Sequence, residues 1–264
     1  MRYKHTKTLL TLVFVMAALS AATFYGCSKP VDYQRMAAVD EAQKAFEVAK
    51  TPEDFLKVAG RYQQILDSGV RSWAIFYNQG NAMMEAGQRG RAIAAYRQAQ
   101  QLHPNNAYLK ANLQYALGQD VSVEPPRTIV GHILFWQNWI GYPTKLHLAV
   151  IVGIVTFLLG IVALFYRSKL LGRIAAAFVL ITLILSFSAA YDWYRFDHIE
   201  HGVVVANDTV ARKGNAESYD PSFTEPLSDG TEFTLLSRRG NWLQIHLPGE
   251  QEGCWIPTKD AVVY

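Results

Sequence analysis

Residues Leu146–Tyr166 read LHLAVIVGIVTFLLGIVALFY and contain no Asp, Glu, Lys or Arg. As an α-helix this stretch is about 30 Å long, which is enough to cross the hydrocarbon core of a bilayer. A second apolar run, 174–194, ends with Tyr191, Trp193 and Tyr194, residue types that gather at membrane interfaces. The two runs predict a transmembrane hairpin. The alternative, a hairpin buried in a soluble core, needs amphipathic partner helices that this chain does not have to spare.

The segment between the two runs, 167–173, predicts which way the hairpin faces. It carries Arg167, Lys169 and Arg173 and no acidic residue. Short loops rich in Lys and Arg stay in the cytoplasm, so both flanks of the hairpin are expected outside it. We therefore expect a multi-pass protein of a bacterial inner membrane with its folded domains on the periplasmic side.

The composition agrees with a membrane protein that has sizeable soluble parts. Half of the 264 residues are hydrophobic, and the formal net charge is +3. No stripe of Lys and Arg with interleaved aromatic residues occurs, so nucleic-acid binding is not expected. With only two cysteines, Cys27 and Cys254, a disulfide framework is excluded.

The first 27 residues have the pattern of an export signal. Three basic residues in Met1–Lys7 precede the apolar run Thr8–Phe24. Phe24-Tyr25-Gly26-Cys27 resembles the lipobox of bacterial lipoproteins, in which the cysteine becomes lipid-modified, although Leu is usual in place of Phe24 and a small residue in place of Tyr25. Lipidation of Cys27, ordinary cleavage a few residues earlier, and retention as an N-terminal anchor all remain open.

Residues 28–124 predict a stack of antiparallel helices. Thr51-Pro52-Glu53-Asp54 is a helix start, with a capping hydroxyl, a proline suited to the first turn and acidic residues near the positive helix end. Ser68-Gly69 ends that helix. The stretch from Trp73 to Pro104 then resembles a tetratricopeptide repeat, in which aromatic and small residues alternate so that two helices pack closely. The matching positions are Phe76, Gly80, Met83, Ala92, Tyr96, Ala99 and Pro104.

A single repeat cannot bury its own apolar face, so neighbouring units are required. Val39–Gly69 is interpreted as a degenerate preceding unit, and Ala107–Leu117 as the closing helix, with Asn105 or Asn106 as its cap. The turn within the central repeat is expected at Ala86–Gly90. The alternative is a generic helical bundle.

Tetratricopeptide repeats usually bind an extended peptide or a partner helix in a groove lined by the first helix of each unit. The resemblance implies six groove positions here: Tyr77, Asn81, Met84, Tyr108, Asn112 and Tyr115. Asn81 and Asn112 are similar to the pair that holds a ligand backbone or a terminal carboxylate in some members. The basic residue expected beside them is Tyr77 in this chain, which argues against a carboxylate. The alternative is that these side chains simply face neighbouring helices or solvent.

The segment 128–142 follows a linker that contains Pro125-Pro126. It is rich in aromatic residues and too short to span a bilayer, so we expect an amphipathic helix lying in the membrane interface. The alternative is a structured linker that packs against the repeats.

Residues 202–264 change to short runs of alternating apolar and polar residues, broken by Gly, Asn, Asp and Pro. The expected strands are Val203–Ala206, Thr209–Arg212, Thr231–Leu236, Trp242–Leu247 and Cys254–Pro257, with turns at Arg238–Asn241 and Pro248–Glu250. Five short strands in about 60 residues predict a small all-β barrel. Gly240-Asn241-Trp242-Leu243 and Gly253-Cys254-Trp255-Ile256-Pro257 resemble bacterial SH3-like domains.

No catalytic motif accompanies these parts, since GxSxG, GxxxxGK[ST], HExxH and CxxC are all missing. The nearest approach to a metal pattern is Asp197-His198-Ile199-Glu200-His201, which has no evident third fixed ligand. Cys254 is expected to be a small apolar residue of the last strand. We therefore expect neither an enzyme nor a bound cofactor.

The order of parts covers the whole chain and resembles the BatE-type proteins of the Bacteroides aerotolerance (Bat) family. The expected fold is a multidomain membrane protein with an α-helical tetratricopeptide array, a two-helix transmembrane hairpin and a small all-β SH3-like barrel. The resemblance implies a non-enzymatic scaffold that works beside membrane proteins with von Willebrand factor A domains, with a link to oxygen or stress tolerance. The alternative function is a cell-wall module whose barrel binds peptidoglycan.

Overall fold

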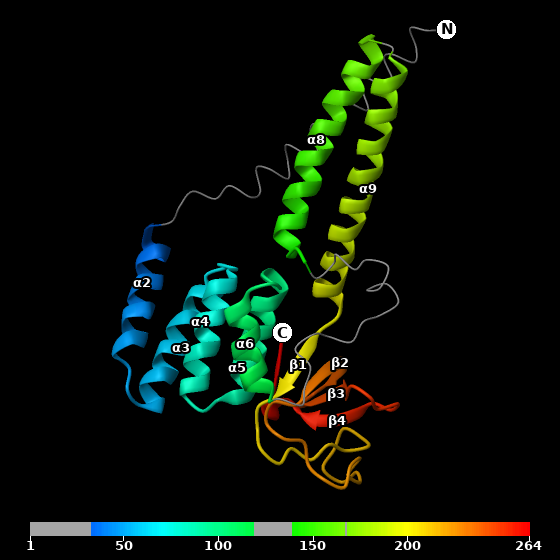
Figure 1. Cartoon of the computed structure of the whole chain (residues 1–264). Helices are drawn as coiled ribbons and strands as arrows, with labels where there is room; N and C mark the ends of the chain where they lie inside the picture. The colour runs from blue at the N-terminus through cyan, green and yellow to red at the C-terminus, as the bar shows by residue number, and fades with distance from the viewer. Residues whose placement is uncertain (1–32, 119–138, 167) are drawn as a thin grey trace. The chain divides into compact units, whose positions relative to one another are not determined.

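The computed structural model describes residues 33–118, 139–166 and 168–264 (Figure 1). The predicted signal with Cys27 lies outside these residues, as does the predicted interfacial helix 128–142 up to its last four positions. Of those four, Tyr142 is the first residue of the next helix.

The chain forms two compact units. The first holds Tyr142–Trp193, and the second combines Gln34–Gly141 with Tyr194–Tyr264. The second unit is therefore built from sequence on both sides of the apolar hairpin.

The first unit is a pair of long helices, α8 (Tyr142–Tyr166) and α9 (Lys169–His198). Both are long and apolar enough to cross a membrane, as the sequence predicts. The loop between them is shorter than the predicted 167–173, because α9 already begins at Lys169. Ser168 explains the early start, since its carbonyl oxygen accepts the Gly172 N–H at 3.0 Å and its hydroxyl accepts the Leu171 N–H at 3.5 Å.

Polar contacts join α8 to α9. The hydroxyl oxygens of Thr156 and Thr182 lie 2.8 Å apart. Lys145 Nζ donates to Asp192 Oδ2 at 2.6 Å, and these two side chains are only 1% and 6% exposed. Removing a lone charge from water is costly, so the pairing is what allows Lys145 and Asp192 to be buried in this hairpin.

The second unit begins with five helices that follow one another along the chain (blue to green in Figure 1). They are α2 (Tyr33–Val48), α3 (Pro52–Asp67), α4 (Trp73–Glu85), α5 (Arg89–Leu102) and α6 (Ala107–Leu117). Thr51 caps the start of α3, as predicted, and Asp54 completes a capping box with it. Asn106 caps α6 by accepting the Leu109 N–H at 2.9 Å, and Gly118 ends it with φ at +93°.

Buried positions of these helices recur at a spacing of 34 residues. Tyr62 and Tyr96 are both buried, and so are Ala82 and Ala116. Six further pairs with this spacing are buried at both members: Ala42 and Phe76, Val58 and Ala92, Ala59 and Ile93, Ile65 and Ala99, Ile75 and Leu109, Gln79 and Leu113. The array is therefore an internal repeat, whose helix pairs share one packing pattern.

The second unit ends with a five-stranded antiparallel sheet in the order β4-β3-β2-β1-β5. Its strands are β1 (His201–Val204), β2 (Glu232–Arg239), β3 (Trp242–His246), β4 (Cys254–Pro257) and β5 (Ala261–Val263), with a 3-10 turn at Thr258–Asp260 before β5. The small antiparallel sheet is as predicted.

Both predicted turns are present. Gly240 adopts φ +56° in a two-residue turn between Arg239 and Trp242. In the other turn, Pro248 precedes Gly249 at φ +92°, and the Glu250 N–H donates to the Leu247 carbonyl oxygen.

The predicted strands need correction. The strand predicted at Thr231–Leu236 is β2, which continues to Arg239. The first strand begins at His201 instead of Val203, because His201 and Tyr264 exchange two backbone hydrogen bonds. The predicted strand Thr209–Arg212 makes only isolated bridges, to Leu227, Pro221 and Trp255. The three-residue strand β5 was not predicted, because so short a run shows no alternation.

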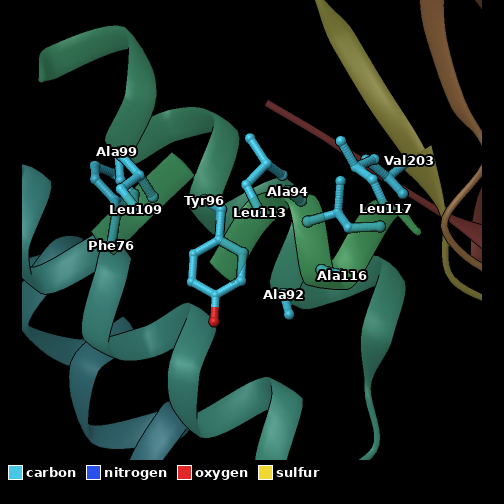
Figure 2. Packing of buried hydrophobic residues seen from close by; sticks show 11 residues of the cluster. Phe76, Ala92, Ala94, Tyr96, Ala99, Leu109, Leu113, Ala116, Leu117 and Val203 are labelled. Carbon is cyan, nitrogen blue, oxygen red and sulfur yellow. The ribbon is translucent and has the colours of Figure 1, made fainter. Parts of the chain in front are cut away.

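The sheet and the helical array share one hydrophobic core. Val203 of β1 is fully buried among residues of α4, α5 and α6, and Figure 2 shows it beside Leu117. Val262 and Tyr264 pack against the same cluster. The next residue, Val204, belongs to the core of the sheet. β1 and its partner β5 therefore form a wall with one face on the helices and the other on the sheet core.

Polar contacts reinforce this junction along α5. Arg97 Nε and Nη2 donate to the two carboxylate oxygens of Glu232 at 2.6 and 2.7 Å. The Gly90 N–H, in the first turn of α5, donates to both carboxylate oxygens of Asp229 at 3.0 and 3.2 Å. A carboxylate at the positive end of a helix is favourable. A Cβ at position 90 would clash with Asp229 Oδ1 and the Val204 carbonyl oxygen, so Gly90 serves this contact and not the predicted turn.

We predict that Glu232→Gln destabilises the helices and the sheet together. The Arg97 and Glu232 side chains are 12% and 23% exposed, so losing the charge of this two-pronged pair should lower the free energy of unfolding by about 1–3 kcal/mol. The measurement is urea unfolding of the detergent-solubilised protein, followed by far-UV circular dichroism.

The matched control is Glu200→Gln. Glu200 pairs with Arg238 at 3.0 Å, but those side chains are 53% and 50% exposed, and the loss should stay below about 1 kcal/mol. Two separate unfolding transitions, with only one of them sensitive to Glu232, would contradict the shared core.

Candidate partner-binding face

The six predicted groove residues fall on α4 and α6. Tyr77, Asn81 and Met84 belong to α4, and Tyr108, Asn112 and Tyr115 belong to α6. We refer to these six residues as the α4–α6 face. The structure joins Tyr77, Asn81 and Asn112 through hydrogen bonds, whereas Tyr108 and Tyr115 are 77% and 81% exposed.

Asn81 is the centre of a hydrogen-bond network. Its Oδ1 accepts from Asn112 Nδ2 at 2.9 Å and from the Tyr96 hydroxyl at 2.8 Å. Asn112 Nδ2 also donates to the Tyr77 hydroxyl oxygen at 3.0 Å. The network links α4, α5 and α6, so the predicted Asn pair first holds the helices in place.

Tyr96 is the member of this network that the groove prediction missed. Its ring fills the space beside Gly80, where a Cβ would lie 2.5 Å from the ring. Burial raises the pKa of Tyr96 well above its ordinary value, so its hydroxyl remains a proton donor at neutral pH. The network therefore stays uncharged.

The same arrangement occurs one repeat earlier. Gln43 Oε1 accepts from the Tyr62 hydroxyl at 3.3 Å and from Asn78 Nδ2 at 3.4 Å. Tyr62 precedes Tyr96 by 34 residues, and Asn78 precedes Asn112 by the same number. In both units a buried tyrosine and an asparagine of the following helix share one amide oxygen. The 34-residue spacing of these Tyr and Asn residues was the sequence signal for Tyr96.

The network leaves one donor and one acceptor unused. Within the part of the chain that the structure describes, neither Asn81 Nδ2 nor Asn112 Oδ1 makes a hydrogen bond. The amide nitrogen is a double donor and the amide oxygen is an acceptor. A peptide group of a ligand offers the complement, a carbonyl oxygen and an N–H.

Met84 and Tyr77 are less exposed on the α4–α6 face than Tyr108 and Tyr115. Both are partly buried against the hydrophobic core of the array. The Tyr77 ring lies near Trp73 and Tyr96, with ring centroids 6.3 and 6.0 Å away. Tyr77 thus supports the network from one side.

The residues considered for metal binding or nucleophilic chemistry, His198, His201 and Cys254, do not form a site together. His198 ends α9 whereas His201 belongs to β1, so the two do not share a helix face. No group of three or more His, Cys, Asp or Glu that could hold a metal ion occurs among the residues the structure describes. Cys254 is buried, and burial raises its pKa to about 11, which keeps the thiol protonated at neutral pH.

His201 instead has a structural position at the junction of helices and sheet. Its Nδ1 lies 3.4 Å from the Thr234 hydroxyl oxygen, and its ring faces Tyr264. Burial lowers the pKa of His201; Arg195 and Arg97 lower it further, and Glu232 opposes them.

We predict that the free energy of unfolding falls as the pH drops below about 6.5, the ordinary pKa of histidine. In that window the unfolded chain binds a proton that the folded chain does not, so acid favours unfolding. His201→Gln should remove this part of the pH dependence. The measurement is urea unfolding of both proteins between neutral and mildly acidic pH, and equal slopes against pH would contradict the assignment to His201.

No family model, curated protein or solved structure matches the chain.

Proposed function

We propose that the protein is a membrane-anchored, non-enzymatic scaffold that binds partner proteins through the α4–α6 face. The observation that carries the proposal is the unused donor and acceptor of Asn81 and Asn112. Both atoms are held by a network that is complete without them, so a ligand meets groups already fixed in place. The exposed rings of Tyr108 and Tyr115 stand on either side of Asn112 along α6 and add contact area.

The helical array is proposed to be a tetratricopeptide array. Its 34-residue spacing of buried positions equals the length of that repeat. The sequence resemblance rests on the stretch from Trp73 to Pro104, and the helix pair α4 and α5 covers this stretch up to Leu102. The sheet, with its short strands and its turns at Gly240 and Gly249, is proposed to be the SH3-like domain.

The hairpin α8 and α9 is proposed to anchor the scaffold in a bacterial inner membrane, with both flanks on the periplasmic side. The flanks belong to one compact unit, which supports a hairpin whose two ends share one side of the membrane. Protease added to intact spheroplasts should then degrade the helical array and the sheet together. Protection of that unit would overturn the orientation.

The physiological setting follows from resemblance alone. The order of parts resembles the BatE-type proteins of the Bacteroides aerotolerance family, which implies membrane proteins with von Willebrand factor A domains as partners. Tethering at the membrane surface raises the effective concentration of such partners.

A second candidate function is binding of peptidoglycan by the sheet. Tyr219 and Leu236 favour it, because they are half exposed on the sheet side of the unit, where aromatic and apolar surface could meet sugar rings. The full chain would then co-sediment with purified sacculi, and changes on the α4–α6 face would leave the sedimented fraction unaltered.

We predict that Asn81→Asp weakens partner capture while keeping the fold. The carboxylate still accepts from Tyr96 and Asn112, but it lacks the donor that Asn81 Nδ2 supplies. The measurement is affinity purification of the full chain from detergent-solubilised membranes, with quantitative mass spectrometry of the recovered proteins. Recovery of the main partner should fall by about tenfold.

Two further variants complete the design. Asn241→Asp makes the same substitution at an exposed turn of the sheet and should leave recovery unchanged. The double variant Asn81→Ala with Asn112→Ala removes both groups, with circular dichroism as the check on folding. Unchanged recovery in the folded Asn81→Asp and double variants would refute partner binding at this face.

A further inference from the structure

We propose that the segment bound by the α4–α6 face is an internal, uncharged, proline-rich stretch in the polyproline II conformation. Residues three apart in this stretch contact Tyr108 and Tyr115. The inference rests on the proposed function, because it specifies the partner segment of the same face.

The spacing of the two tyrosines supports this conformation. Tyr108 and Tyr115 are seven residues apart on α6, so they project within about 20° of each other and about 10.5 Å apart along the axis. Residues on one side of a polyproline II helix repeat every three residues, or about 9.3 Å. Residues on one side of a β-strand repeat at about 6.7 Å and about 13 Å, which fits the tyrosines less well.

The hydrogen-bonding groups distinguish polyproline II from an α-helical ligand, which could also reach both rings. The peptide groups inside an α-helix are paired with one another and have little use for a fixed amide. A polyproline II segment has no internal hydrogen bonds, so its carbonyl oxygens remain open to a donor such as Asn81 Nδ2. An N–H from a residue between two prolines can reach Asn112 Oδ1, which lies between the tyrosines in sequence.

The side of α6 that carries Tyr108 and Tyr115 has no charged residue, which favours an uncharged ligand. Tyr108, Ala111, Asn112 and Tyr115 lie on one side of α6, and all four are uncharged. Lys110, the single charged residue of α6, lies about 160° round the helix from Tyr108 and donates to Asn105 Oδ1 at 3.3 Å. Aromatic rings with amide groups match a neutral proline-rich segment, whereas a free C-terminal carboxylate would find no positive residue on the side of α6 that carries Tyr108 and Tyr115.

The test is titration of the full chain, in lipid nanodiscs, with short synthetic peptides capped at both ends and followed by calorimetry. The probe carries proline at every third position with alanine and serine between. One comparison peptide replaces the prolines by alanine, and a second, rich in valine and threonine, favours an extended strand. The probe should bind at least about tenfold more tightly than either comparison peptide.

Variants of the α4–α6 face test whether the probe peptide binds there. Tyr108→Ala and Tyr115→Ala remove exposed rings, so they should weaken the probe by about tenfold without changing the fold. Val48→Ala, at an exposed position of α2, should leave its affinity unchanged. Equal binding of the strand-forming peptide, or affinity unaffected by both tyrosine variants, would overturn the inference.

This outcome is separable from the proposed function. If Asn81→Asp reduces partner recovery but the proline probe does not bind, the face binds proteins and the polyproline II assignment is wrong. If neither experiment responds, both are wrong.

Discussion

The structure depends on the contact between α5 and the sheet. Arg97 and Glu232 are 135 residues apart in sequence, yet they form a two-pronged ion pair beside the shared core that contains Val203. Asp229 occupies the N-terminus of α5, and Arg89 donates to the carbonyl oxygens of Ala116 and Leu117 at the end of α6. The sheet thus closes the end of the helical array. Without it, the apolar side of α5 and α6 that receives Val203 would face water.

This contact also explains why a hairpin can interrupt a folded unit. Along the chain, the helical array ends before α8, and the sheet begins with β1. Two residues separate the end of α9 at His198 from the start of β1 at His201. The Gln34–Gly141 and Tyr194–Tyr264 parts fold together as one unit, although the two long helices stand between them in sequence.

Much of the local structure could be predicted because its causes are local. Thr51 and Pro52 start α3, Asn106 caps α6, and Gly240 makes its turn, each through a conformation or hydrogen bond set within a few residues. Ser168 has the same kind of local effect, but the basic composition of the loop outweighed it in the prediction. The start of α9 was therefore missed.

What the sequence could not reveal are the pairings made over long distances. The resemblance implied that Asn81 and Asn112 would meet, but it did not show that their first partners are each other, Tyr77 and Tyr96. Nothing near Gly90 indicates that Asp229 will lie against it, so a turn was the natural interpretation. The six predicted groove residues lie on two helices, α4 and α6, while the atoms that their network leaves unused emerged only from the three-dimensional structure.

The shared core has a consequence for biosynthesis. The helices up to Leu117 are made well before Val203, Glu232 and Val262, which complete their packing. At ~5–20 residues per second, synthesis of the intervening chain takes on the order of 10 s. During that time the newly made helices present an uncovered apolar surface. A chaperone, or the sheet of a neighbouring copy, has that interval in which to occupy it.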